Sequence, residues 1–236
     1  MNTAHTYPFQ IHKEIVYSVR IWRRALTDSL RRVNSYHFSG CLLLELAGGG
    51  SPLSRHVVPD WNHFVVDKNI DTFSQGNHQN IVADVHHLPI NNHTVSLIIT
   101  ISSLQYFDHE TFFAECHRVL KKDGVVAVHE NGALNPIILL VRLARKIFGL
   151  FNQNTRTYCA TINKYYRPEN VPEGFELIFQ HADGFFLPIL FILEKFRVPG
   201  TAHMLPVMQK LDDFLFLKLP ALRRFAFFNV IHLRRA

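Results

Sequence analysis

Three acidic residues and a run of glycines follow a pattern that suits a nucleoside ligand. Glu45, Asp67 and Asp84 each close a short apolar run, and "GGG" (48–50) follows the first acid. Glycine has no side chain, so such a turn lets a ligand lie against the backbone. Asp67 follows the turn by about twenty residues, the spacing expected of an acid that accepts hydrogen bonds from a ribose diol. Asp84 suits an exocyclic amine, and the set therefore predicts an adenosine-containing ligand.

The apolar runs that carry these acids predict strands of a parallel sheet. They are continuous, which is typical of strands buried on both faces. The predicted strands are 41–46, 63–67, 80–84, 95–101 and 124–130. Between the last two lies "DHETFFAECHRVLKKDG", which predicts a helix with Asp108 as its N-cap and a lysine pair at its end. Strands that alternate with helices indicate a parallel sheet with helices on both faces, and ligands bind beyond the carboxyl ends of its strands.

The two ends of the chain have a different character. Residues 1–40 predict a helical lead-in. After the fifth strand we expect an apolar helix at 135–151, a strand at 174–182, a helical region at 205–224 broken at Pro220, and a final strand at 225–233. The last two strands are expected to form an antiparallel edge on the sheet.

The residues at the glycine turn argue against two common kinds of nucleotide site. A nicotinamide site favours Gly-x-Gly-x-x-Gly, but Leu53 stands at the third glycine position. A phosphate-binding loop ends in Gly-Lys-Ser/Thr, and the sequence has no such tripeptide. A cofactor without a pyrophosphate needs neither feature.

Residues 41–130 resemble the class I S-adenosylmethionine-dependent methyltransferases. The motifs occur in order: "LLLELAGGGSP", "FVVDKN", "IVADVHHLPI" and "VSLIITISSLQYFDHETFFAECHRVLKKDGVVAVHENG". The closest similarity is to the small-molecule branch that includes quinone-biosynthesis methyltransferases, and "HENGALNP" resembles a stretch of some bacterial members.

The resemblance implies a Rossmann-like α/β fold with a mostly parallel seven-stranded sheet, helices on both faces and an antiparallel edge strand near the C-terminus. It implies one methyltransferase domain over 1–236, with a lead-in at 1–40, a cofactor-binding core at 41–134 and substrate-covering helices and final strands at 135–236. S-adenosylmethionine would be the cofactor. The implied cofactor-binding residues are Glu45, Ala47, Gly48, Gly49, Asp67, Lys68, Asp84, Val85, Thr100 and Ile101.

The sequence also departs from the family pattern. Ala47 stands where the first motif glycine is usual and Ser51 where the last is usual, and Glu45 replaces the commoner Asp. An alanine at this turn is expected to need a negative φ.

Three residues are candidates for catalysis. His129 and Glu130 end the fifth strand, and Tyr106 stands where many relatives carry a histidine. Methyl transfer from a sulfonium needs a base only if the nucleophile must lose a proton. Tyr106 is equally interpreted as a core aromatic side chain, and His129 with Glu130 as a buried, hydrogen-bonded polar pair.

Other interpretations of the acids remain open. The glycines alone would make a tight turn, Asp67 alone would be a helix N-cap, and Asp84 alone would cap a turn. At the level of function, the rivals are a nucleotide-linked oxidoreductase and a non-catalytic protein that keeps the methyltransferase fold.

Composition narrows the partners. The formal net charge is +6, but the basic residues form no stripe with a nucleic-acid-reading module, so no nucleic-acid partner is expected. Neither the histidines nor the three cysteines have metal-site spacing, and no metal is expected. Twenty phenylalanines and the basic, apolar segment 135–151 favour a lipophilic small-molecule acceptor. We expect a cytoplasmic protein; segment 135–151 would contact a membrane surface or pack on the sheet.

Overall fold

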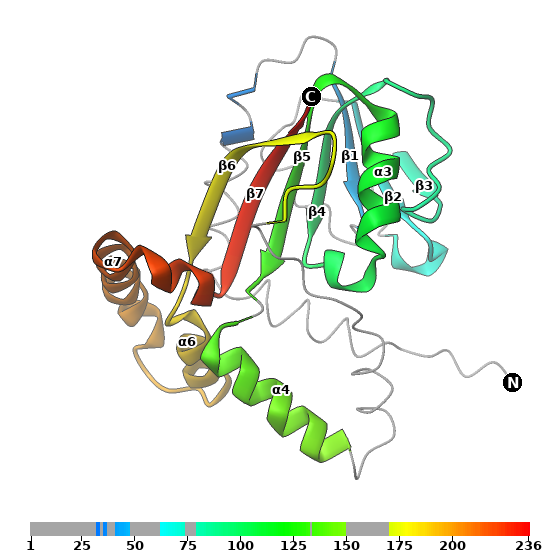
Figure 1. Cartoon of the computed structure of the whole chain (residues 1–236). Coiled ribbons are helices and arrows are strands. Elements are labelled where there is room, and N and C mark those ends of the chain that lie inside the picture. Colours follow the sequence, from blue (N-terminus) through cyan, green and yellow to red (C-terminus); the bar gives the residue numbers. More distant parts are fainter. Residues whose placement is uncertain are drawn as a thin grey trace, which may run out of the picture.

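Seven strands form one sheet in the computed structural model, which describes residues 32–33, 35–36, 41–47, 62–73, 79–132, 134–149 and 170–236 (Figure 1). The order across the sheet is β3-β2-β1-β4-β5-β7-β6. The strands are β1 (Leu42–Leu46), β2 (Asn62–Asp67), β3 (Gln79–Val82), β4 (Val95–Ile101), β5 (Leu120–Asn131), β6 (Phe175–Asp183) and β7 (Phe228–Arg235). All but β7 run in the same direction, because β7 pairs antiparallel with both β5 and β6. The expected antiparallel strand is therefore β7, and it lies between β5 and β6.

The predicted strands match the observed ones in order, but three of them differ at an end by two residues or more. The last strand, predicted at 225–233, is β7 at Phe228–Arg235, because residues 220–225 form a 3₁₀ helix. β3 stops at Val82, two residues before Asp84, because the chain turns there into the 84–87 segment. β5 begins at Leu120, so the lysine pair expected to end the helix lies in β5 instead. The register between β4 and β5 slips here, and Asp123 has a φ of +61°, as in an irregular strand rather than a helix end.

Helix α3 (His109–Val119) covers one face of the sheet (Figure 1). Its N-cap is Asp108, as predicted, whose side chain accepts from the Thr111 N–H at 3.0 Å. Its apolar side packs on the sheet residues of even number, including Leu44, Leu46 and Ile98. The odd-numbered residues Leu43, Leu97, Ile99, Val125 and Ala127 form a second cluster on the other face, with Val33.

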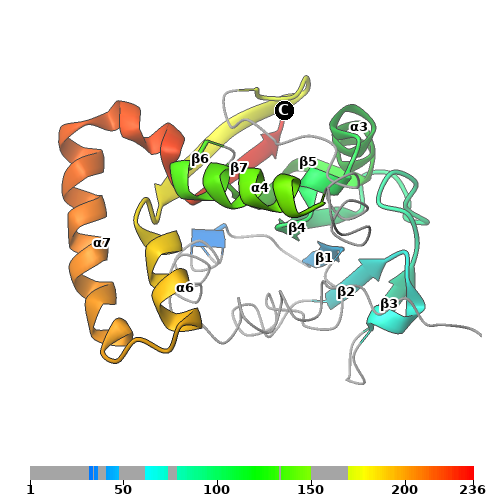
Figure 2. The ribbon, with the colours of Figure 1, turned by 90° about the horizontal axis from the view of Figure 1, so that it is seen from below.

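Three further helices lie beyond the carboxyl ends of the central strands. They are α4 (Pro136–Gly149), α6 (Leu187–Lys195) and α7 (Thr201–Lys218), and the 3₁₀ helix η4 (Pro220–Phe225) connects α7 to β7. Figure 2 views the molecule from this side: α4 crosses in front of the β5 and β7 region, and α6 and α7 lie to the left, away from β1, β2 and β3. The helix at 135–151 and the break at Pro220 are confirmed. The helical lead-in at 1–40 falls almost wholly outside the described residues.

None of the helices among the described residues is both long enough and apolar enough to cross a lipid bilayer. Side-chain groups suited to holding a metal ion are also lacking in the described ranges.

Candidate active site

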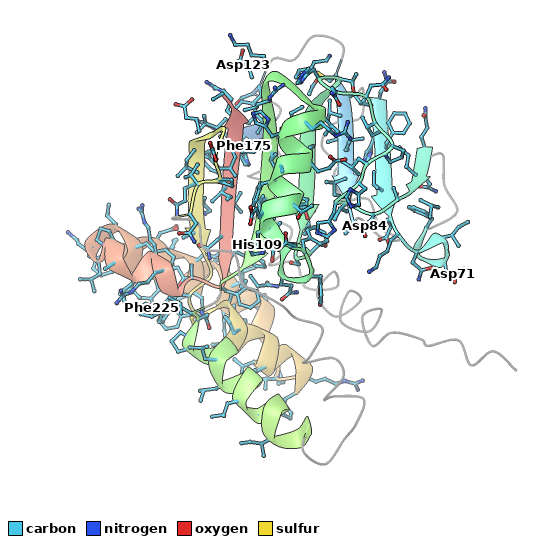
Figure 3. All side chains as sticks on the ribbon, turned by 45° about the vertical axis from the view of Figure 1, so that its right-hand side comes forward. Asp71, Asp84, His109, Asp123, Phe175 and Phe225 are labelled. Atoms are coloured by element: carbon cyan, nitrogen blue, oxygen red, sulfur yellow. The ribbon has the colours of Figure 1, made fainter. Side chains whose placement is uncertain are left out.

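The predicted cofactor residues gather at the edge of the sheet where β1, β2, β3 and β4 end. Parallel pairing aligns these ends: Leu46 lies beside Val66 of β2 and Thr100 of β4, and Asp67 lies beside Val82 of β3. Asp84 lies at this edge in Figure 3, whereas Asp123 lies at the opposite one. Gly48 and Gly49 lie outside the described residues, so their predicted role stays a prediction.

Glu45 is buried in β1 and has a partner that the sequence analysis did not identify. Its Oε2 lies 3.1 Å from Nε2 of His63, which is buried on β2. A buried carboxylate needs such a partner to offset the loss of water. The contact fixes the carboxylate at the end of β1, and the role of Glu45 in cofactor binding stays a prediction.

Ala47 adopts a left-handed conformation, with φ of +53°. The expectation of a negative φ is therefore wrong. The Ala47 N–H donates to the Val66 carbonyl at 2.8 Å, and this bond ties the start of the turn to β2. A non-glycine residue in this region costs about 1 kcal/mol or more. The chain thus keeps a turn geometry that favours glycine without having the glycine.

Asp67 uses one carboxylate oxygen in a local turn. Its Oδ1 accepts from the Asn69 N–H at 3.0 Å. The N-cap of the following 3₁₀ helix η2 (Ile70–Thr72) is Asn69, whose side chain accepts from Asp71 N. The helix N-cap interpretation of Asp67 is therefore wrong. Within the described ranges Oδ2 has no partner, so it is available to accept from a ligand.

Asp84, like Asp67, uses one carboxylate oxygen in a local turn. Its Oδ1 accepts from the His86 N–H at 2.9 Å and lies 2.6 Å from His86 Nδ1. The backbone hydrogen bond from His86 is the largest cause that lowers the pKa of Asp84, and the charge of Lys68 adds to it. Asp84 does cap a turn, but its side chain is still 54% exposed. The remaining oxygen faces solvent near Lys68.

His86 joins this turn to the start of α3. Its Nε2 accepts from the Asp108 N–H at 3.1 Å, which assigns the ring proton to Nδ1 and makes Nδ1 the donor to Asp84. The ring also meets Phe107 edge-on, with centroids 5.8 Å apart. The sequence analysis did not identify His86 as part of the site; its position two residues after Asp84 was the available signal.

A second contact from α3 holds the segment after Asp84. Glu115 Oε1 accepts from the Leu88 N–H at 2.6 Å. Arg118 pairs with Glu115 and donates to the carbonyls of Leu88, at 3.0 Å, and Ile90, at 2.9 Å. Residues three apart on a helix share a face, so the Glu115–Arg118 pair was visible in the sequence, although its target was not.

Thr100 and Ile101 end β4. The Thr100 hydroxyl is fully buried and makes no hydrogen bond to any residue that the structure describes. An unsatisfied buried hydroxyl is costly, and a hydrogen-bonding ligand at this edge would satisfy it. Ile101 is half-buried and packs toward α6. Val85, the remaining predicted contact, is buried in the core beside α3.

Glu130 is buried at the end of β5. Its Oε1 accepts from the Leu104 N–H at 2.7 Å, and the N–H groups of Ser103 and Asn131 also donate to the carboxylate. Burial outweighs these bonds and raises the pKa of Glu130 to about 7. The carboxylate therefore holds the turn after β4, which leads into the 3₁₀ helix η3 (Leu104–Tyr106).

His129 lies on the opposite face of the sheet from Glu130, as consecutive strand residues do. Its ring stacks on His232 of β7 with centroids 6.4 Å apart, and burial lowers the pKa of His129 to about 3. The Tyr36 hydroxyl lies 2.8 Å from Nδ1 of His232 on that face. Both residues are buried and have partners, as the interpretation of a buried polar pair expects, but they lie on opposite faces of the sheet.

Tyr106 ends η3, within the turn that Glu130 holds. Its N–H donates to the Ser103 carbonyl at 3.0 Å, and its side chain is partly buried against the core under α3. Both earlier interpretations, a core aromatic and a residue near the acceptor, fit this place at the rim of the site.

The arrangement defines a class of fold: a Rossmann-like sheet whose inserted antiparallel strand is β7. Comparisons with solved structures give the same result. A SAM-dependent methyltransferase from Archaeoglobus fulgidus superposes with a TM-score of 0.57 at 14% identity, covering 97% of this chain and 100% of that one. Geranyl diphosphate C-methyltransferase from Streptomyces coelicolor, solved with Mg²⁺, geranyl diphosphate and S-adenosyl-L-homocysteine, gives 0.55 at 13% identity, covering 100% and 84%.

A third structure, Haemonchus contortus phosphoethanolamine N-methyltransferase 2, gives a TM-score of 0.53 at 12% identity and covers 90% of this chain and 52% of that one. No curated protein matches the sequence significantly. Residues 52–128 match the family model described as a methyltransferase domain, which spans β2 to most of β5. About a third of the chain therefore matches a methyltransferase-domain model, and its fold is similar to that of solved S-adenosylmethionine-dependent methyltransferases.

Proposed function

We propose that this chain transfers a methyl group from S-adenosylmethionine to a small, lipophilic acceptor, at oxygen or carbon. The observation that carries the proposal is the pair of carboxylates at neighbouring strand ends. Asp67 and Asp84 each spend one oxygen on a local turn and leave the other available. Two acceptors placed this way fit a ribose diol and an adenine amine, with Lys68 beside them.

Other residues at this edge fit the rest of the cofactor. The left-handed turn at Ala47 directs the chain away from β1, and the buried Thr100 hydroxyl supplies a further polar group. The cofactor brings an activated methyl group, so the protein has to supply alignment and a dry site. Glu45 with His63 and Glu115 with Arg118 act in this proposal by fixing the segments that line the cofactor.

The acceptor side is proposed to be apolar because α4 and α6 lie at the same edge of the sheet as the cofactor residues, on the side of β5 and β7 (Figure 2). The described part of α6 is rich in apolar residues, and Leu187 and Leu190 are buried against β7. One structural neighbour has geranyl diphosphate bound, and another has a phosphoethanolamine substrate in its name. Proteins with this fold therefore bind different acceptors, and in this proposal α4 and α6 determine which acceptor this chain binds.

A general base is needed only for an acceptor that must lose a proton, such as a phenol or an enol carbon. Burial raises the pKa of Glu130 to about 7 and lowers that of His129 to about 3, and Glu130 holds the turn that carries Tyr106. In this proposal Glu130 positions Tyr106 at the acceptor, and His129, on the other face, packs with His232.

Calorimetric titration separates this function from its first rival. We expect S-adenosylhomocysteine to bind and NAD not to bind; tighter binding of NAD would favour a nucleotide-linked oxidoreductase. The variant Asp67→Asn keeps an oxygen for the Asn69 N–H but loses the negative charge at Oδ2, and should weaken S-adenosylhomocysteine binding about tenfold or more. Asp71→Asn is the matched control, because the Asp71 side chain is exposed on η2.

Turnover needs a second experiment. A cell extract incubated with the protein and methyl-deuterated S-adenosylmethionine is analysed by mass spectrometry for a labelled product, with the Asp67→Asn protein as the negative control. We expect a lipophilic labelled product. Cofactor binding without any labelled product across extracts would favour the non-catalytic alternative.

A further inference from the structure

Three helices form the surface of the molecule beyond the carboxyl ends of the strands. Figure 2 shows α4, α6 and α7 side by side on this surface, and α6 packs against both of the others. α7 is attached through one side, where Phe216 and Asp212 are buried and Asp212 accepts from the Phe186 N–H. The opposite side of α7 faces solvent.

The exposed sides of α4 and α7 are apolar. On α4, Leu140, Leu143 and Ile147 follow helical spacing and are all more than half exposed. On α7 the exposed apolar residues are Met204, Val207, Leu211, Phe214 and Leu217, with Phe214 56% and Leu217 73% exposed. Scattered apolar residues on a surface are ordinary, but a helical stripe on each of two helices at the same end of the molecule indicates a binding surface.

The same helices are rich in positive charge. Helix α4 contains Arg142, Arg145 and Lys146 and has no acidic residue. The exposed residues of α7 and η4 include Lys210, Lys218, Arg223 and Arg224, against a single exposed acid, Asp213. Basic residues beside exposed apolar stripes are typical of helices that lie in the interface of an anionic membrane.

We propose that the exposed faces of α4 and α7 dock this protein on an anionic lipid surface. The positive charge selects this occupant over a second copy of the chain, because two copies meeting through this face would bring their lysines and arginines together. The helices lie on the bilayer rather than cross it, since neither is long and apolar enough to span it.

Docking in this way turns the carboxyl edge of the sheet toward the lipid. A lipophilic acceptor would then pass from the bilayer to the site without crossing water. Membrane binding itself depends on the helices and requires neither cofactor nor turnover, so it is tested separately from the proposed function.

The test is co-sedimentation of the full chain with vesicles of phosphatidylcholine alone or with about 30 mol% phosphatidylglycerol. We expect binding to the anionic vesicles, little binding to the neutral ones, and release at high salt. Phe214→Ser/Leu217→Ser should weaken binding about tenfold or more, because two large apolar side chains that would enter the bilayer become polar. Phe214→Leu/Leu217→Met, the matched control, should bind within about twofold of the parent.

The charge is tested by Lys210→Glu and Lys218→Glu, each expected to weaken binding about fivefold or more. Lys122→Glu is the control, since Lys122 is exposed next to Asp123 at the opposite edge of the sheet (Figure 3). Thermal unfolding and circular dichroism establish that each variant is folded, and Leu140→Ser/Leu143→Ser on α4 repeats the test on the other helix. Equal binding to neutral vesicles, or no binding by the folded parent, overturns the proposal. So does light scattering in which the serine variant on α7 dissociates a dimer while vesicle binding is unchanged.

Discussion

The buried carboxyl of Glu130 makes the free energy of unfolding depend on pH near neutrality. Burial raises the pKa of its carboxyl from 4.5 to about 7. In the folded protein the group therefore keeps its proton up to about pH 7, whereas in the unfolded chain it loses the proton at a lower pH. The free energy of unfolding must consequently fall as the pH rises through this window, and it stays at the lower level above it.

The variant Glu130→Gln removes this titration. Each pKa unit corresponds to about 1.4 kcal/mol, so the change in the free energy of unfolding amounts to about 3 kcal/mol. The glutamine also carries a pH-independent penalty, because its NH₂ group meets N–H donors from Ser103 or Asn131. We expect the variant to be less stable than the parent at about pH 5, and to gain up to about 3 kcal/mol relative to the parent by about pH 8.

Urea unfolding followed by circular dichroism, at several pH values from about 5 to 8, measures this difference. Subtracting the two proteins cancels the titration of groups they share. Glu176→Gln is the control, since Glu176 is exposed on β6. If the difference in unfolding free energy between Glu130→Gln and the parent did not change with pH, the argument that burial outweighs the three backbone donors would be refuted.

Two further predictions concern the turns around the cofactor edge. Ala47→Gly should raise the free energy of unfolding by roughly 0.5 kcal/mol, because relief of the left-handed strain outweighs the added entropy of the unfolded glycine; a loss in thermal unfolding experiments would contradict this. Arg118→Lys should lower stability by about 2 kcal/mol and weaken S-adenosylhomocysteine binding severalfold in calorimetry, because lysine cannot bond Glu115 and two carbonyls in one plane; Arg223→Lys, at an exposed position, should change neither.

The central sheet was predictable because its strands are buried on both faces. β4 is almost wholly buried, and its sequence is a continuous apolar run with correspondingly clear ends. β3 lies at the edge of the sheet and is mostly exposed, so its polar sequence gave a weak signal and its end was placed two residues late. The position of β7 depends on pairing between residues about a hundred positions apart, such as Val128 with Ile231, and local patterns do not encode it.

The sequence was enough to predict which acidic side chains belong to the site, but not which residues they contact. Asp67 and Asp84 were found because each ends an apolar run of the sequence, whereas the contacts of Glu45 with His63 and of Asp84 with His86 depend on which strands and turns become neighbours. The backbone conformation of Ala47 was not predictable either. Its left-handed φ occurs together with the hydrogen bond from its N–H to the Val66 carbonyl of the neighbouring strand, and the sequence around Ala47 does not show that bond.

The two sides of the proposed site are built in different ways, and this difference limits what sequence can say about the acceptor. The cofactor side consists of strand ends and short turns held by backbone hydrogen bonds, so its geometry follows from the sheet. The acceptor side consists of α4, α6 and α7, which are attached to the sheet through a few buried residues such as Leu190 and Phe216. Their outward faces are not constrained by the core, so they are free to vary with the acceptor and with the surface on which the protein works.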